Sequence, residues 1–249
     1  GILFVTGAVI LIICRIFAGS MHGVLTDTVS SQLHTTMGSI PLYSWSGIHN
    51  RHFNQHYPTH SGTFTDDSAA LGADITELCI DLNYTNFTLA PSQDDYFHIS
   101  SEGIGKYQYY TEDSVFYING FHDRSANTSR LILEVPDIRF SCVDVNFGAG
   151  TAALSSLKGD SIMLDIGAGQ LTLNEIDCDY ICADVGAGSV SIDNGKTLNA
   201  DFDIGMGKLV YKGFIDSDLA ADVGMGNITL QIADTQDAHN YDLEGAMGA

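Results

Sequence analysis

Four histidines in the first quarter of the chain have the spacing that metal chemistry would need. They are separated by three, four and four residues: His49, His52, His56 and His60. On a helix these imidazoles would share one face and suit a transition metal. However, Gly47 and Pro58 interrupt such a helix, and no carboxylate or cysteine completes a ligand set inside the run. Because ligation requires a held geometry, we favour a solvated spacer over a metal site.

The cysteines form no recognisable framework. There are five of them, at irregular intervals: Cys14, Cys79, Cys142, Cys178 and Cys182. An odd number without regular spacing does not indicate a disulfide scaffold, and the C-x-x-x-C pair is neither a thioredoxin-like motif nor a zinc signature. We predict free thiols.

One aspartate recurs at intervals of 19: Asp165, Asp184, Asp203 and Asp222. If stacked, these carboxylates would repel one another by only about 1 kcal/mol in water. They can act in structure, by accepting backbone N–H groups at a neighbouring bend, or they can bridge calcium. Calcium needs several oxygen ligands, and no second aspartate recurs in register. We therefore favour the structural role, and calcium binding is the alternative.

The sequence gives only weak evidence for a catalytic site. A glycoside hydrolase needs two converging carboxylates, one of them with a raised pKa, and a lyase usually needs a base beside an acidic metal site. The clustered Asp160, Asp177 and Asp179 lie at expected turns, where aspartate is common. The lysines fall in unrelated columns of the repeat described next: Lys158, Lys196, Lys208 and Lys212. We predict no enzyme, and no catalytic, cofactor-binding or metal-binding residue.

An internal repeat determines the fold. The first glycines of five G-x-G bends fall at intervals of 19: Gly148, Gly167, Gly186, Gly205 and Gly224. The residue before each is apolar: Phe147, Ile166, Val185, Ile204 and Val223. Apolar residues also alternate with a period of two on both sides of the bend, which is the strand period. Each unit therefore predicts strand, bend, strand and short turn. The predicted fold is an all-β, parallel β-solenoid of 19-residue rungs, right-handed as parallel crossovers favour.

The ends of this domain are less regular. Residues 78–89 fit the template as an early rung, and residues 107–110 and 115–118 predict a hairpin. We place the solenoid at residues 71–249, with an irregular part at 71–142 and regular repeats at 143–249. The last residues begin another rung without its second strand, so we expect its edge near Leu243 to be covered by further chain or by a partner strand.

The N-terminal stretch, residues 1–19, is predominantly apolar, and its single charged side chain is Arg15, near one end. This composition predicts one transmembrane helix at residues 1–19, with a cleaved signal peptide as the alternative. Residues 20–70 predict a polar connector rich in His, Ser and Thr.

The chain is strongly acidic, with 31 acidic and 10 basic side chains and a formal net charge of −21. Such a field repels nucleic acid, so we predict no nucleic-acid partner. Cationic partners and divalent ions remain compatible with it.

Together these motifs resemble the putative-adhesin β-strand-repeat family, whose domain is called Toastrack. The resemblance covers roughly residues 71–249. It rests on the D-[IV]-G-[AM]-G units, the early Ile80-Asp81-Leu82 rung, the hairpin, the strand at 131–136 and the rung at 240–243. Departures are the connector, Asn146 in place of Asp, and Glu244 in place of a bend residue.

The resemblance implies a domain outside the membrane after one N-terminal helix, relatives in operons linked to cell-envelope stress, and no established catalytic residue. We therefore expect a single-pass membrane protein with an extracytoplasmic scaffold or interaction module and a protein or cell-envelope partner. The alternative is an adhesin or glycan-binding module, and a β-helix polysaccharide-active enzyme is the remote one.

Overall fold

The computed structural model describes residues 56–66, 75–83, 85–103, 105–121, 129–233 and 240–245, all within one compact unit formed by residues 51–249. The elements in these ranges are strands. Among them, no helix has the length and apolarity needed to cross a bilayer. The predicted transmembrane helix at 1–19 and most of the predicted connector at 20–70 lie outside the described residues.

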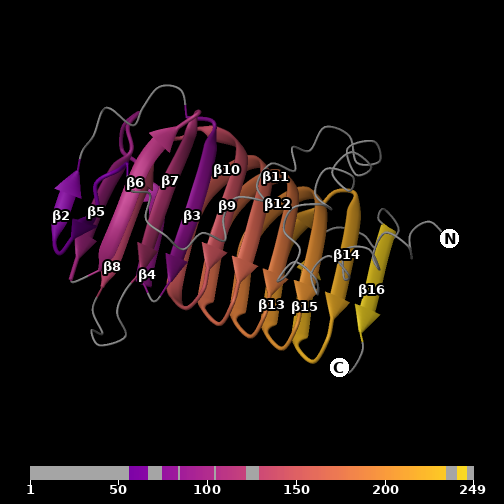
Figure 1. Cartoon of the computed structure of the whole chain (residues 1–249). Helices are drawn as coiled ribbons and strands as arrows, with labels where there is room; N and C mark the ends of the chain where they lie inside the picture. Colours follow the sequence, from indigo (N-terminus) through magenta and orange to yellow (C-terminus); the bar gives the residue numbers. More distant parts are fainter. Residues whose placement is uncertain are drawn as a thin grey trace, which may run out of the picture. The chain divides into compact units, whose positions relative to one another are not determined.

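The regular repeats form stacked parallel strands (Figure 1). They are β9 (Arg139–Phe147), β10 (Gly150–Ile166), β11 (Gln170–Val185), β12 (Ser189–Ile204), β13 (Lys208–Ile215), β14 (Asp218–Val223) and β15 (Asn227–Ile232). The register joins Ile166 to Val185, Val185 to Ile204, and Ile204 to Val223. Paired neighbours are therefore one full repeat apart in the sequence, and the predicted parallel solenoid is confirmed.

Each rung has three paired segments, which we call the first, second and third faces. The first face precedes the glycine bend: 143–147, 162–166, 181–185, 200–204 and 219–223. The second follows it: 150–155, 170–174, 189–193, 208–212 and 227–231. The third closes the rung: 157–159, 176–178, 195–197 and 213–215. The sequence predicts a short turn for the third face, because so short a segment carries too few inward apolar side chains to show alternation.

The core lies between the faces. Phe147, Ile166, Val185 and Ile204 have no exposed surface, and Val223 is 8% exposed, which confirms the predicted buried column. On the second face the inward positions are also apolar: Ala152, Leu154, Leu171, Leu173, Val190, Ile192, Leu209 and Tyr211. Stacking at about 4.8 Å places each side chain on its equivalent in the next rung, so similar apolar residues recur in each column.

The early rung is also confirmed. Strands β3 (Glu77–Asn83) and β4 (Thr85–Pro91) stack on β9 and β10. Beyond them lie β5 (His98–Glu102), β6 (Lys106–Glu112), β7 (Val115–Phe121) and β8 (Arg130–Val135), with β7 on β3 and β8 on β4. The predicted hairpin is β6 and β7, whose turn consists of Asp113 and Ser114 at positive φ. Strands β5 to β8 thus extend one end of the stack before the chain returns to β9.

The sheet begins earlier than the sequence indicates. The short strands β1 (His60–Ser61) and β2 (Phe64–Asp66) pair antiparallel with β6 and β5, inside the segment 20–70 that we predicted to be connector. Such edge pairing is made by backbone groups and leaves no apolar periodicity for a sequence pattern to show.

At the other end, β16 (Asn240–Gly245) pairs with β14 and places Leu243 beside Ala221. This is the predicted start of a further rung. That its edge is covered in the native molecule stays a prediction.

The bends generate the first test. A Cβ added at Gly207 would stand 2.6 Å from the carbonyl oxygen of Gly188 and 2.7 Å from a methyl group of Val185. Because displacing the neighbouring backbone is energetically costly, we expect Gly207→Ala to lower the free energy of unfolding by about 1–3 kcal/mol. The middle position of a bend is exposed and accommodates a larger side chain, so Ala187→Met should change the free energy of unfolding by less than about 0.5 kcal/mol. Urea denaturation of both variants measures this, and equal effects would contradict the packing account.

Candidate functional site

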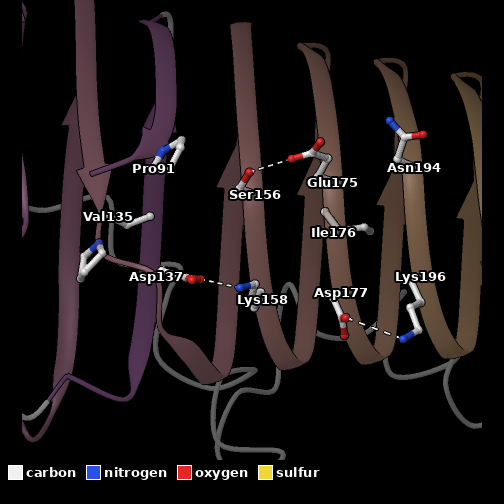
Figure 2. A pocket seen from close by; sticks show the side chains of 11 residues that line it. Pro91, Val135, Asp137, Ser156, Lys158, Glu175, Ile176, Asp177, Asn194 and Lys196 are labelled. Carbon is white, nitrogen blue, oxygen red and sulfur yellow. Dashed lines mark hydrogen bonds and ion pairs between the residues drawn. The ribbon is translucent and has the colours of Figure 1, made fainter. Parts of the chain in front are cut away.

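A groove runs across successive rungs where the second face turns into the third (Figure 2). Its volume is about 510 Å³. Two rows of side chains line it: Ser156, Glu175 and Asn194 in one, and Lys158, Asp177 and Lys196 in the other. Within each row, the members belong to β10, β11 and β12 in turn, so the groove follows the direction of stacking.

The first row lies at the corner itself and has unusual backbone geometry. Ser156, Glu175 and Asn194 have φ of 54°, 60° and 56°, the left-handed conformation that turns the strand onto the third face. Asparagine tolerates this region, whereas serine and glutamate rarely adopt it. Ser156 Oγ donates to the Glu175 carboxylate at 2.9 Å, and Asn194 Nδ2 donates to Asn174 Oδ1 at 3.1 Å. The row therefore combines local strain with polar contacts between rungs.

The second row alternates in charge. Lys158, Asp177 and Lys196 occupy equivalent positions of three rungs. Lys158 Nζ lies 2.5 Å from Asp137 Oδ1, and Lys196 Nζ lies 3.9 Å from Asp177 Oδ2. The prediction that the lysines fall in unrelated columns is therefore wrong for Lys158 and Lys196, which two full repeats separate. Lys208 and Lys212 lie in two different columns of the second face.

Three predicted turn aspartates are gathered by one arginine. Arg139 on β9 donates from Nε to Asp160 at 2.7 Å, from Nη1 to Asp177 at 3.2 Å and from Nη2 to Asp179 at 2.7 Å. These hydrogen bonds raise the pKa of Arg139, mainly through Asp160. The aspartate side chains are 49–59% exposed. A catalytic acid is held protonated by an apolar pocket, and this cluster instead offers ionic contacts near water.

The outer side of the second face is nearly uncharged. From β4 to β15 its six rungs present eighteen outward side chains in three columns. These are Asn86, Thr88, Ala90, Thr151, Ala153, Ser155, Gln170, Thr172, Asn174, Ser189, Ser191, Asp193, Lys208, Val210, Lys212, Asn227, Thr229 and Gln231. All are exposed or half-buried. The single acid, Asp193, is bound by Lys212 Nζ at 2.8 Å, and this contact lowers the pKa of Asp193.

The outer side of the first face is acidic. In the described rungs it carries Glu77, Asp81, Asp144, Asp165, Asp184, Asp201, Asp203, Asp218 and Asp222, without a lysine or arginine between them. The surface of the solenoid is therefore electrically uneven, with acids on the first face and hydroxyl and amide groups on the second.

The aspartate column faces outward, as predicted. The bend N–H groups donate to carbonyls of the preceding rung, for example Gly186 to Ile166 at 2.9 Å and Ala187 to Gly167 at 2.7 Å. For these N–H groups the neighbouring backbone provides the acceptors, and the structural role of Asp165, Asp184, Asp203 and Asp222 stays a prediction.

The described part of the chain brings no three His, Cys, Asp or Glu side chains together as metal ligands. Of the four spaced histidines, His49 and His52 lie outside the described residues, His56 is exposed, and His60 stacks on Tyr109.

Four of the cysteines are described, and they are free thiols, as predicted. Burial raises the pKa of Cys142 to about 12 and that of Cys178 to about 11, well above the range of a reactive thiolate.

The chain is similar to several known proteins. A family model described as Toastrack DUF4097 matches residues 76–248. A putative adhesin from Parabacteroides distasonis is 14% identical over 77% of this chain and 96% of its own, with a TM-score of 0.40. One from Bacteroides fragilis is 12% identical over 77% and 94%, with a TM-score of 0.45. A putative cell adhesion protein from Clostridium sporogenes is 13% identical over 76% and 97%, with a TM-score of 0.36. No curated protein matches the chain.

The corner row can be tested by exchange between its own members. Glu175→Asn places a residue that tolerates positive φ in the strained position, so we expect a gain of up to about 1 kcal/mol in the free energy of unfolding. The reverse change, Asn194→Glu, should lose a similar amount. Thermal or urea unfolding of both variants measures the pair. A loss of stability in Glu175→Asn would show that the contact with Ser156 outweighs the strain.

Proposed function

Since this chain belongs to the Toastrack DUF4097 family, we propose that it is a non-catalytic interaction module whose binding surface is the second face. The observation that carries the proposal is the nearly uncharged outer side of this face in a chain of net charge −21. The outward positions of the first face carry nine acids in the described rungs, whereas those of the second face carry one, already bound by Lys212.

The backbone supports a binding role as well. Parallel hydrogen bonding between rungs fixes the second face from β10 to β13 in one register, apart from a shift between Ile192 and Gly195. Its outward groups therefore stand at set intervals of about 4.8 Å along the stack. A surface held in this way loses little conformational entropy on binding, which favours affinity from many weak contacts.

The place of the module in the cell is part of the proposal. Residues 1–19 would anchor the chain in the membrane, and the repeats would stand outside the cytoplasm as a scaffold of the cell envelope. The partner would be a protein or another envelope component, and nucleic acid is disfavoured by the net charge. The nearly uncharged second face gives specific support to the alternative, an adhesin or glycan-binding module.

The proposal is tested by amide-to-acid changes, which alter charge with little change of shape. Gln170→Glu with Asn227→Asp puts two charges on the second face, and we expect at least tenfold weaker binding of the full chain to washed envelopes of the producing cells. Asn146→Asp with Asn199→Asp adds the same charge to the acidic first face and should bind like the wild type.

Co-sedimentation measures the binding, and thermal melting checks that both variants fold. Equal binding by the two variants would remove the second face from the proposal.

A further inference from the structure

We propose that the second face binds an uncharged polysaccharide extended along the stack, across β4 to β15. This inference rests on the proposed function and adds the chemical class of the partner. The supporting observations are what the eighteen outward side chains contain, what they lack, and how they are spaced.

The side chains match the chemistry of a glycan. At the middle column, Thr88, Thr172, Ser191 and Thr229 present hydroxyl groups, and a hydroxyl both donates and accepts hydrogen bonds. The flanking columns add amides at Asn86, Gln170, Asn174, Asn227 and Gln231. Sugar hydroxyls have the same double capacity, so hydrogen bonds can form with them in either direction along the face.

The same face lacks what other partners require. Protein interfaces depend on buried anchors, chiefly Trp, Tyr, Met and Arg, and these eighteen positions hold no aromatic residue, methionine or arginine. Membrane surfaces need a basic and apolar face, and the largest apolar side chain here is Val210. Anionic polymers need a basic surface, and this face has two lysines, of which Lys212 is bound to Asp193, beside the acidic first face.

The spacing favours a polymer over a small molecule. Outward positions recur at every rung, so a ligand with repeating hydroxyls can meet hydroxyl or amide groups on β4, β10, β11, β12 and β15 in turn. On β13 it would meet Val210 between Lys208 and Lys212. Each contact is weak, and linked contacts multiply in effective affinity. The charged side chains within this stretch are Asp193 on β12 and its partner Lys212 on β13, together with Lys208.

The corner groove flanks this stretch. Glu175 and Asn194 follow directly after Asn174 and Asp193 of the outer column. The corner that they form limits how far a polysaccharide could extend across the second face. The ligand would therefore run parallel to the groove, along the direction of stacking.

The test uses the full chain and defined probes. Cellulose, chitin, xylan and dextran represent uncharged polysaccharides, and polygalacturonate and hyaluronate represent anionic ones. We expect binding to at least one uncharged probe, none to the anionic probes, and affinity that rises with chain length from hexasaccharide to polymer. Absence of binding to all four uncharged probes would overturn the inference.

Matched variants locate the site. Thr172→Val with Ser191→Ala removes two hydroxyls from the second face while keeping shape, and we expect roughly tenfold weaker binding. Thr76→Val with Ser217→Ala removes two hydroxyls elsewhere on the surface and should bind like the wild type. Equal affinity for both variants would place the sugar elsewhere and overturn the inference.

The outcomes also separate this inference from the proposed function. If Gln170→Glu with Asn227→Asp weakens binding to envelopes while protease treatment of the envelopes abolishes it, the partner is a protein. The interaction module would then stand, and the polysaccharide would be excluded.

Discussion

The structure depends on in-register stacking of rungs, in which each residue pairs with its equivalent one repeat along the sequence. Each side chain lies about 4.8 Å from the equivalent side chain of the next rung. A residue type can therefore recur in a column only if it packs well against the same or a similar residue type. Apolar columns fill the core under this constraint. Bends approach each other so closely that a Cβ at Gly188 would lie 2.5 Å from the carbonyl oxygen of Gly169, which leaves glycine as the residue that fits.

The same constraint makes the surface informative. Like charges stacked on one another repel, and the third face avoids this by alternating Lys158, Asp177 and Lys196. The first face instead keeps Asp165, Asp184, Asp203 and Asp222 in one column, where exposure to water limits the repulsion. Since both arrangements occur in one molecule, stacking alone does not determine where charged residues lie. The low charge of the second face is therefore a separate property of this sequence.

Much of the fold could be predicted from the sequence because five glycine bends recur without insertion, which specifies parallel stacking and the buried column from Phe147 to Val223. The third face could not, because Leu157 and Ile176 show no alternation within so short a segment. The partners of Arg139 were also missed, since it precedes the first regular bend. The second face could have been predicted, because its outward columns follow from the inward ones. The sequence interpretation considered the aspartates and glycines and did not consider the hydroxyl and amide groups.

Lysine footprinting tests the central claim, that the second face is the binding surface, most directly. Lys208 lies on that face, and Lys196 lines the groove on the third face. The full chain is acylated with and without washed envelopes, and modification of each lysine is read by mass spectrometry. The account predicts that envelopes protect Lys208 and leave Lys196 as reactive as before. Protection of Lys196 with unchanged Lys208 would move the site to the groove and contradict it.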